Sequence, residues 1–269
     1  MTRWSTSNRD AKHDFPPLIA VYLYSHVRRV LISPMVRLFA FLLLVSLLAD
    51  AHAAAPRTFA EAKKAAWAIY AANPVEFYCG CRYSGNRVDL ASCGYEPRKN
   101  RQRAERIEWE HIVPAWVIGH QRQCWQNGGR ANCAKKDATY RRAEADLHNL
   151  VPSIGEINGD RSNYGFAWLP QKPTQYGSCP MVVDFKARKA MPRQPIRGMI
   201  ARTYFYMADR YKLRLSKQDR QLYGAWSKTY PPQPWELARN QRIACVMGHG
   251  NAFVGSVDLS RCPQSNARR

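Results

Sequence analysis

Three short segments concentrate polar side chains that a protein core would not favour: residues 108–114, 144–150 and 155–163. Glu110 and His111 are adjacent in the first segment, and Asn158 lies in the third. A neutral histidine can remove a proton from water. A carboxylate and an amide oxygen suit a hard divalent cation that keeps most of its water ligands. Together these groups could hydrolyse a phosphodiester, where water must be deprotonated and charge on phosphorus neutralised.

Each of these residues also has an ordinary structural interpretation. Taken alone, Glu110 is more often a surface carboxylate, His111 a hydrogen-bonded structural histidine, and Asn158 part of a turn. Their occurrence together in a strongly basic, cysteine-rich chain favours the catalytic interpretation.

The net charge indicates the kind of partner. The 269 residues include 41 Lys and Arg against 20 Asp and Glu, a formal charge of +21. Residues 1–53 hold six basic and three acidic side chains, so +18 remains beyond them. A field of this sign attracts polyanions, of which nucleic acid is the commonest. Anionic lipid and cell-wall polymers are alternative partners that charge alone also fits.

An N-terminal apolar segment predicts export. Residues 38–48 read LFAFLLLVSLL, with Arg37 before them and the small-x-small cleavage signal Ala51-His52-Ala53 after them. A run this short fits a signal peptide better than a spanning helix, although a membrane anchor is the alternative. Signal peptides rarely start so far before their apolar run, which makes Met35 a better candidate for the true start than Met1.

All eight cysteines follow this cleavage signal, which predicts disulfides. An even number in an exported chain is typical of cystines. A zinc site is the alternative, but it needs Cys-x-x-Cys spacing, and the closest pair here is separated by one residue. Proximity favours Cys124 with Cys133 and Cys245 with Cys262. The cysteines are Cys79, Cys81, Cys93, Cys124, Cys133, Cys179, Cys245 and Cys262.

Residues 1–53 are interpreted as an extension plus signal peptide, and residues 54–269 as one α+β domain in which helices predominate beside two small β pieces. The capping box at 58–61 starts a helix to about residue 72. Further helices are predicted over residues 137–147, 195–212, 216–228 and 234–247. A cystine-tied hairpin is predicted over 77–93, a strand over 106–113, a loop over 121–136 and irregular structure over 163–180.

The predicted strand poses a geometric problem for the candidate site. Neighbouring side chains in a strand point to opposite faces, so Glu110 and His111 would diverge. We therefore expect a bend or bulge that brings both side chains to one place.

Four motifs in fixed order resemble the bacterial endonuclease I family of periplasmic and secreted nucleases. They are Glu-Trp-Glu-His-x-Val-Pro-Ala-Trp at 108–116, Arg-Gln-Cys-Trp-Gln-x-Gly-Gly-Arg at 122–130, Glu-Ala-Asp-Leu-His-Asn-Leu at 144–150 and Gly-Glu-x-Asn-Gly-Asp-Arg-Ser-Asn at 155–163. The resemblance covers roughly residues 58–254, and motifs this long in this order are highly specific. Near its end the chain departs from the family, with Gly-His-Gly-Asn-Ala-Phe at 248–253, which bears on the C-terminal disulfide and not on the catalytic centre.

The resemblance implies a disulfide-stapled fold with the ββα-metal, or His-Me finger, motif. It implies a sugar-non-specific endonuclease that cuts DNA and RNA to 5′-phosphate ends by contacting the backbone rather than the bases. One hydrated divalent cation is expected, Mg²⁺ by preference, in a site that Mn²⁺ or Ca²⁺ could also occupy. We expect a periplasmic or secreted monomer without a stable membrane anchor.

The resemblance also assigns roles to particular residues. His111 is the general base, Glu110 and Asn158 are the direct metal ligands, and Arg130 holds the scissile phosphate, which a guanidinium can bind in a bidentate manner. Glu144 is expected to fix the metal waters or the turn that orients His111.

Three further expectations concern supporting contacts. A backbone carbonyl near Glu144 is expected to accept from His111 Nδ1 and fix the tautomer. His148 and Asn149 suggest an HNH-type site, but we interpret them as supporting residues because the family places the ligand at Asn158. Arg161 is expected to contact phosphate or to pair with Asp160.

Two other functions compete with the nuclease interpretation. A basic exported protein could bind DNA or a surface polymer without catalysis, but such a protein has no use for Glu110 and His111 beside Asn158. A zinc hydrolase would carry a motif such as His-Glu-x-x-His, which this sequence lacks.

Overall fold

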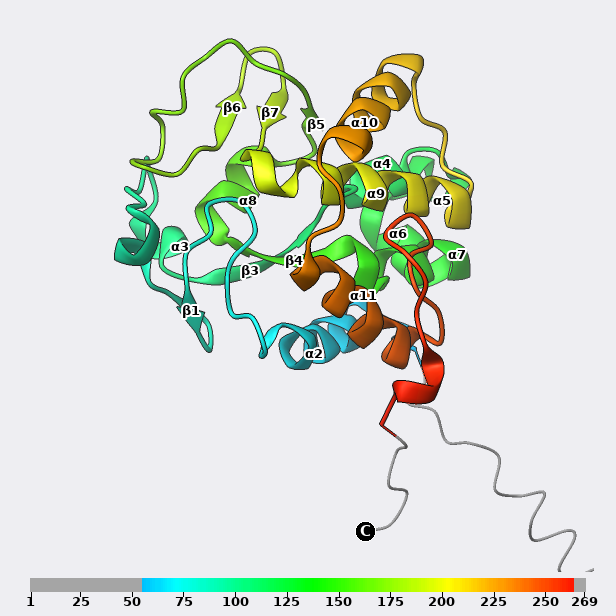
Figure 1. Cartoon of the computed structure of the whole chain (residues 1–269). Helices are drawn as coiled ribbons and strands as arrows, with labels where there is room; N and C mark the ends of the chain where they lie inside the picture. The colour runs from blue at the N-terminus through cyan, green and yellow to red at the C-terminus, as the bar shows by residue number, and fades with distance from the viewer. Residues whose placement is uncertain (1–54, 264–269) are drawn as a thin grey trace, which may run out of the picture. The chain divides into compact units, whose positions relative to one another are not determined.

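A two-stranded antiparallel ribbon and the helix after it position the candidate site. Strand β3 (Ile107–His111) pairs with β4 (Leu150–Ile154) in unbroken register, from Ile107 opposite Ile154 to His111 opposite Leu150. Helix α8 (Gly155–Arg161) begins directly after β4. All of β4 is buried, with α2 (Phe59–Tyr70) and α8 packed against it (Figure 1).

The computed structural model describes residues 55–263, which lie within one compact unit. The predictions made for residues 1–53, including Met35 as the start, fall outside the described residues. Within 55–263, no helix is both long enough and apolar enough to cross a bilayer.

Helices predominate over strands in the described chain, as predicted. Thr58 caps the first of them by accepting a hydrogen bond from the Glu61 amide at 3.2 Å, and Ser216 caps α10 in the same way at 3.0 Å. The helices besides α8 are α2 (Phe59–Tyr70), α3 (Arg101–Ala104), α4 (Ala115–Gly119), α5 (Gln123–Gln126), α6 (Gly129–Lys136), α7 (Ala138–Glu144), α9 (Gln194–Tyr211), α10 (Lys217–Thr229) and α11 (Pro234–Met247). Short 3-10 turns are η1 (Leu90–Cys93), η2 (Leu147–Asn149) and η3 (Leu259–Arg261).

The β structure is more extensive than the two pieces predicted. Strands β1 (Tyr83–Ser84) and β2 (Arg87–Val88) form the expected hairpin. Strands β5 (Gly165–Phe166), β6 (Val182–Asp184) and β7 (Lys189–Met191) form a further sheet in the order β5-β7-β6. Each of its strands has only two or three residues, too few for an alternating pattern to be recognised in sequence.

The predicted loop over residues 121–136 is wrong, because this segment forms α5 and α6. The Cys124–Cys133 disulfide joins the two helices, and the Asn132 amide donates to the Cys124 carbonyl at 2.7 Å. Arg122 pairs with Asp137 across the segment at 2.7 Å. These tertiary links override the weak helix propensity of the Gly- and Asn-rich sequence.

The cysteines form four disulfides, and both predicted pairs are confirmed. Cys124 bonds Cys133 and Cys245 bonds Cys262, while Cys81 bonds Cys93 across the base of the hairpin. The fourth bond joins Cys79 to Cys179, 100 residues later. It ties the β1–β2 region to the segment before β6.

Candidate active site

A cleft of about 690 Å³ contains most of the predicted site residues. All five residues of β3 line it, together with Phe59, Lys63, Arg103, Pro114, Ala115, Trp116, Trp125, Arg130, Asn158, Arg161, Ser162 and Asn163. The register of β3 with β4 is unbroken along all five residues, and Glu110 and His111 nevertheless both line the cleft. The expected bulge at Glu110 and His111 is therefore wrong, since the regular register already brings both side chains to the cleft.

His111 is held as a neutral imidazole. Its ring is buried against Phe59, with 4.7 Å between the ring centroids. Nε2 donates to the Glu144 carbonyl at 2.8 Å, so the carbonyl contact was predicted but the nitrogen was not. Burial lowers the pKa of His111 to about 4, and the charges of Arg130 and Arg161 act in the same direction. With Nε2 as donor, Nδ1 carries the free lone pair.

Glu110 offers one free oxygen to the cleft. Its Oε1 accepts from the Tyr78 hydroxyl and from Arg161 Nη1, both at 2.7 Å. Within the described residues, Oε2 accepts no hydrogen bond. Burial raises the pKa of Glu110, while the Arg161 charge and the Tyr78 hydrogen bond oppose that shift. The carboxylate is thus fixed through one oxygen and available through the other.

Arg161 is a buried support for the Glu110 carboxylate. Its side chain is 0% exposed, and it also donates to the carbonyls of His111 at 2.9 Å and Ile112 at 2.6 Å. The predicted pair of Arg161 with Asp160 is wrong, because Asp160 pairs with Arg98 at 2.8 Å. The predicted phosphate contact stays a prediction for a guanidinium that is buried in this structure.

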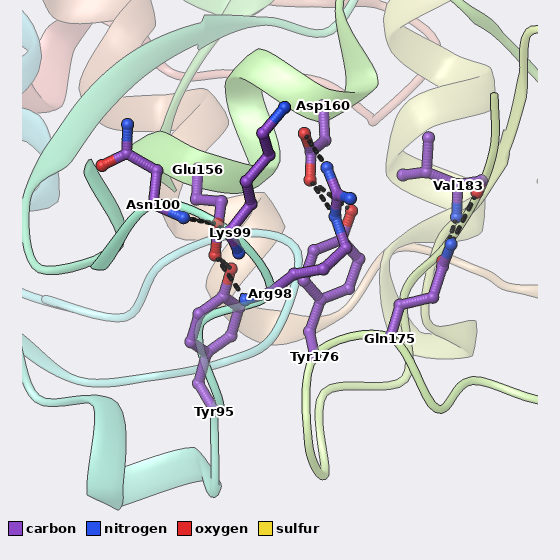
Figure 2. Close-up of polar contacts among 9 residues, drawn as sticks. All are labelled: Tyr95, Arg98, Lys99, Asn100, Glu156, Asp160, Gln175, Tyr176 and Val183. Atoms are coloured by element: carbon purple, nitrogen blue, oxygen red, sulfur yellow. Dashed lines mark hydrogen bonds and ion pairs between the residues drawn. The ribbon is translucent and has the colours of Figure 1, made fainter. Parts of the chain in front are cut away.

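Asn158 lies on α8, and the NH₂ end of its side-chain amide is hydrogen-bonded. Nδ2 donates to Glu108 Oε2 at 3.1 Å, whereas Oδ1 accepts no hydrogen bond from the described residues. The opposite side of the helix is anchored by Glu156 and Asp160 (Figure 2). Glu156 accepts from the Tyr95 hydroxyl at 2.8 Å and from the backbone amides of residues 98–100.

Arg130 reaches the cleft from α6 and is half exposed. Its Nε donates to Glu144 Oε1 at 2.6 Å, and its guanidinium lies 5.4 Å from the Phe59 ring centroid. The Tyr140 hydroxyl donates to the same Glu144 oxygen at 3.1 Å. Glu144 thus orients His111 through its carbonyl and Arg130 through its carboxylate.

His148 and Asn149 do not line the cleft. His148 is buried against Tyr206, and its Nε2 lies 3.2 Å from the His249 carbonyl oxygen. The Asn149 side chain accepts from the Val113 amide at 2.7 Å and donates to the Val113 carbonyl at 3.0 Å. It therefore fixes the turn that leaves β3 after His111, which is a supporting contact.

The donor set fits a hydrated hard cation. Glu110 Oε2 and Asn158 Oδ1 are oxygen donors without a hydrogen-bond partner in the described chain, and both residues line the cleft. Residues 55–263 contain no group of three His, Cys, Asp or Glu side chains placed to hold an ion. A cation here would have few protein ligands and many waters, as is usual for Mg²⁺.

Two contributing residues were missed from sequence. Tyr78 and Glu108 hold Glu110 and Asn158 by the hydrogen bonds given above. Glu108 had a recognisable signal, because it lies two residues before Glu110 and so on the same face of the strand. Tyr78 precedes the first cysteine in a loop, and no pattern distinguishes it there.

Comparisons with known proteins place the chain in a family. Residues 47–257 match the sequence profile of the family described as Endonuclease I. An extracellular deoxyribonuclease of Aeromonas hydrophila is 52% identical over 217 residues, which are 79% of this chain and 93% of that protein. A periplasmic deoxyribonuclease of the same species is 49% identical over 235 residues, 86% of this chain and 98% of the other. An endonuclease-1 of Buchnera aphidicola is 46% identical over 200 residues, or 73% and 80% of the two chains. The chain therefore belongs to the endonuclease I family.

Proposed function

We propose that this protein is a periplasmic or secreted endonuclease that hydrolyses DNA and RNA without regard to the sugar and leaves 5′-phosphate ends. The observation that carries the proposal is the neutral His111 beside two free oxygen donors in one cleft. The names of the relatives, extracellular and periplasmic deoxyribonucleases, support both DNA as substrate and export.

In this proposal, β3, β4 and α8 form a ββα-metal motif. Glu110 and Asn158 would hold one hydrated divalent cation, Mg²⁺ by preference, with Mn²⁺ or Ca²⁺ as substitutes. A bound cation supplies neutralisation of charge on the phosphate and on the leaving 3′ oxygen. Arg161 and Tyr78 keep the Glu110 carboxylate in place.

His111 is the proposed general base. Nδ1 accepts a proton from the attacking water, while the Nε2–H bond to the Glu144 carbonyl fixes the ring and stabilises the imidazolium that forms. The ordinary pKa of histidine is depressed here, so the ring is neutral at neutral pH. A phosphate beside Arg130 would offset one of the positive charges that depress this pKa and so strengthen the base.

Arg130 is the proposed phosphate contact. Its Nε is held by Glu144, and its two terminal nitrogens donate to no other described residue. A guanidinium with a fixed edge and a free edge can donate to two phosphate oxygens with little further ordering. Contacts of this kind involve the backbone and read no bases, which is compatible with both DNA and RNA.

Nicking of supercoiled plasmid by the oxidised mature protein tests the proposal. We expect cleavage with Mg²⁺, none with EDTA, and the same behaviour on a structured RNA. Sealing of the nicks by a ligase would identify the 5′-phosphate ends, and size-exclusion chromatography would check the proposed monomer. A mobility shift of intact plasmid without cutting would instead support a basic protein that only binds polyanions.

A further inference from the structure

Glu108 makes a contact with Asn158 that the proposed chemistry has not yet used. Its carboxylate receives Asn158 Nδ2 at 3.1 Å on Oε2. Arg103 donates to both oxygens, from Nε to Oε1 at 2.9 Å and from Nη2 to Oε2 at 2.6 Å. Arg106 Nη2 adds a bond to Oε1 at 2.9 Å. Glu108 is therefore held from several directions and has little freedom to turn.

Both oxygens of Glu108 act as acceptors. Arg103 and Arg106 donate to Oε1, and Arg103 also donates to Oε2. Arginine has only donors, so a carboxylate that meets these side chains on both oxygens accepts on both. It can therefore hold the NH₂ end of a neighbouring amide and not the oxygen end.

This selectivity matters because an asparagine amide has two chemically different ends. A flip of the amide exchanges Oδ1 with Nδ2, and only the oxygen can bind a cation. Without a partner that selects one end, both orientations would be accessible. Glu108 selects the orientation in which Nδ2 is occupied and Oδ1 is free.

Two glycines let α8 approach this carboxylate. Gly155 and Gly159 lie one turn apart and so share a face of the helix. A Cβ on Gly155 would lie 2.6 Å from the Arg103 carbonyl oxygen and 2.9 Å from Glu108 Oε1. A Cβ on Gly159 would collide with the Arg103 guanidinium. Because this face of α8 carries no side chains at Gly155 and Gly159, the helix lies close enough for Asn158 to bond to Glu108.

We propose that Glu108, held by Arg103 and Arg106, is a positioning residue that turns the Asn158 amide so that its oxygen faces the cation. This inference rests on the proposed function, in which Asn158 is a metal ligand. It explains why two glutamates alternate on β3. Glu110 would bind the cation, while Glu108 orients the second ligand.

An isosteric exchange of donor and acceptor tests the inference. In Glu108→Gln, hydrogen bonds from the two arginines to the glutamine oxygen would turn its NH₂ toward Asn158 and favour the flipped amide. We expect Mn²⁺ affinity, measured by electron paramagnetic resonance on the mature oxidised protein, to fall about 10–100-fold, as for other residues that orient metal ligands. In Glu108→Gln with Asn158→Asp, the ligand has two equivalent oxygens and the net charge of wild type returns. Most of the lost affinity should then return.

The matched control is Glu105→Gln, which removes the same charge three residues away. Glu105 pairs with Arg101 at 2.9 Å and lies outside the cleft, so this variant should bind Mn²⁺ as wild type does. The titrations are repeated at high salt, because screening removes a long-range charge effect but not an orientation effect.

Three results would overturn the inference: wild-type affinity in Glu108→Gln, a deficit that disappears at high salt, or no recovery in the double variant. Plasmid nicking by the same wild-type preparation keeps the two proposals apart. Wild-type protein that binds Mn²⁺ but cuts nothing contradicts the proposed function alone. Wild-type protein that binds no Mn²⁺ contradicts both.

Discussion

Two arginine–glutamate pairs flank His111, and they differ in burial. Arg161 and Glu110 lie 2.7 Å apart, with side chains 0% and 5% exposed. Arg130 and Glu144 lie 2.6 Å apart, with side chains 50% and 7% exposed. Both arginines act to lower the pKa of the histidine between them. Residue type alone would give the two pairs the same role.

The difference in burial separates support from substrate contact. Arg161 commits its terminal nitrogens to Glu110 and to two backbone carbonyls at the end of β3 and just beyond it. Arg130 commits only Nε among the described residues, so its outer edge can meet a phosphate. A guanidinium whose terminal nitrogens all donate to groups of the protein stabilises the local structure, whereas one with free donors can bind a ligand.

Replacement of the buried arginine should have the largest effect. Arg161→Met leaves Glu110 buried without its counter-charge, and we expect the free energy of unfolding to fall by about 3–5 kcal/mol. Urea unfolding followed by circular dichroism measures this loss, and nuclease activity should disappear with it. A loss below about 1 kcal/mol, the range of surface pairs, would show that the two pairs are energetically alike.

Replacement of the half-exposed arginine should affect activity far more than stability. Arg130→Ala removes a charge proposed to meet the phosphate, so we expect kcat/KM for plasmid to fall about 10²–10³-fold. The free energy of unfolding should change by less than about 1 kcal/mol, since the pair is partly solvated. Arg130→Lys keeps the charge but not the fork and should lie between. Equal losses of stability in Arg130→Ala and Arg161→Met would remove the distinction.

Removal of the Cys124–Cys133 disulfide should affect only the part of the site that carries Arg130. Cys124→Ser with Cys133→Ser frees α6, which carries Arg130, and should lower stability by about 2–3 kcal/mol for a loop this short. Arg161 lies on α8, remote in sequence from this bond. Mn²⁺ binding at Glu110 and Asn158 should therefore survive while activity falls toward that of Arg130→Ala. Loss of Mn²⁺ binding in the folded double variant would contradict this separation.

The free energy of unfolding should depend on pH, because the histidines His111 and His148 are buried. Burial lowers the pKa of both His111 and His148 to about 4, below the ordinary value of 6.5. Between these values the unfolded chain takes up protons that the folded chain refuses, so stability is complete above about pH 6.5 and falls toward pH 4. Urea titrations across this range should show a smaller acid-induced loss in His111→Ala than in wild type. An equal loss would mean that His111 takes up its proton equally in both states.

The sequence predicted which residues gather at the candidate site better than it predicted the packing around them. Glu110, His111, Asn158 and Arg130 do meet in one cleft, because motif residues retain their spacing along the elements that carry them. The helices with clear caps and long apolar periodicity also match the prediction closely.

The remaining features depend on contacts between distant segments. The partner of Arg161 lies 51 residues away, while a carboxylate next to it in sequence suggested an ion pair. The helices over 123–136 are linked by a disulfide and flanked by the Arg122–Asp137 pair, and the strands β5–β7 are too short to show a pattern. The expected bulge is absent, because β3 keeps a regular register with β4 while Glu110 and His111 both line the cleft.

The most direct test of the central claim compares His111→Ala with wild type in single-turnover cleavage of DNA, with saturating protein and Mg²⁺. If His111 is the general base, the rate should fall by about 10²–10⁴-fold, while DNA affinity and Mn²⁺ binding remain near wild type. A variant that cuts within about tenfold of wild type would contradict the assignment and require another group to activate the water.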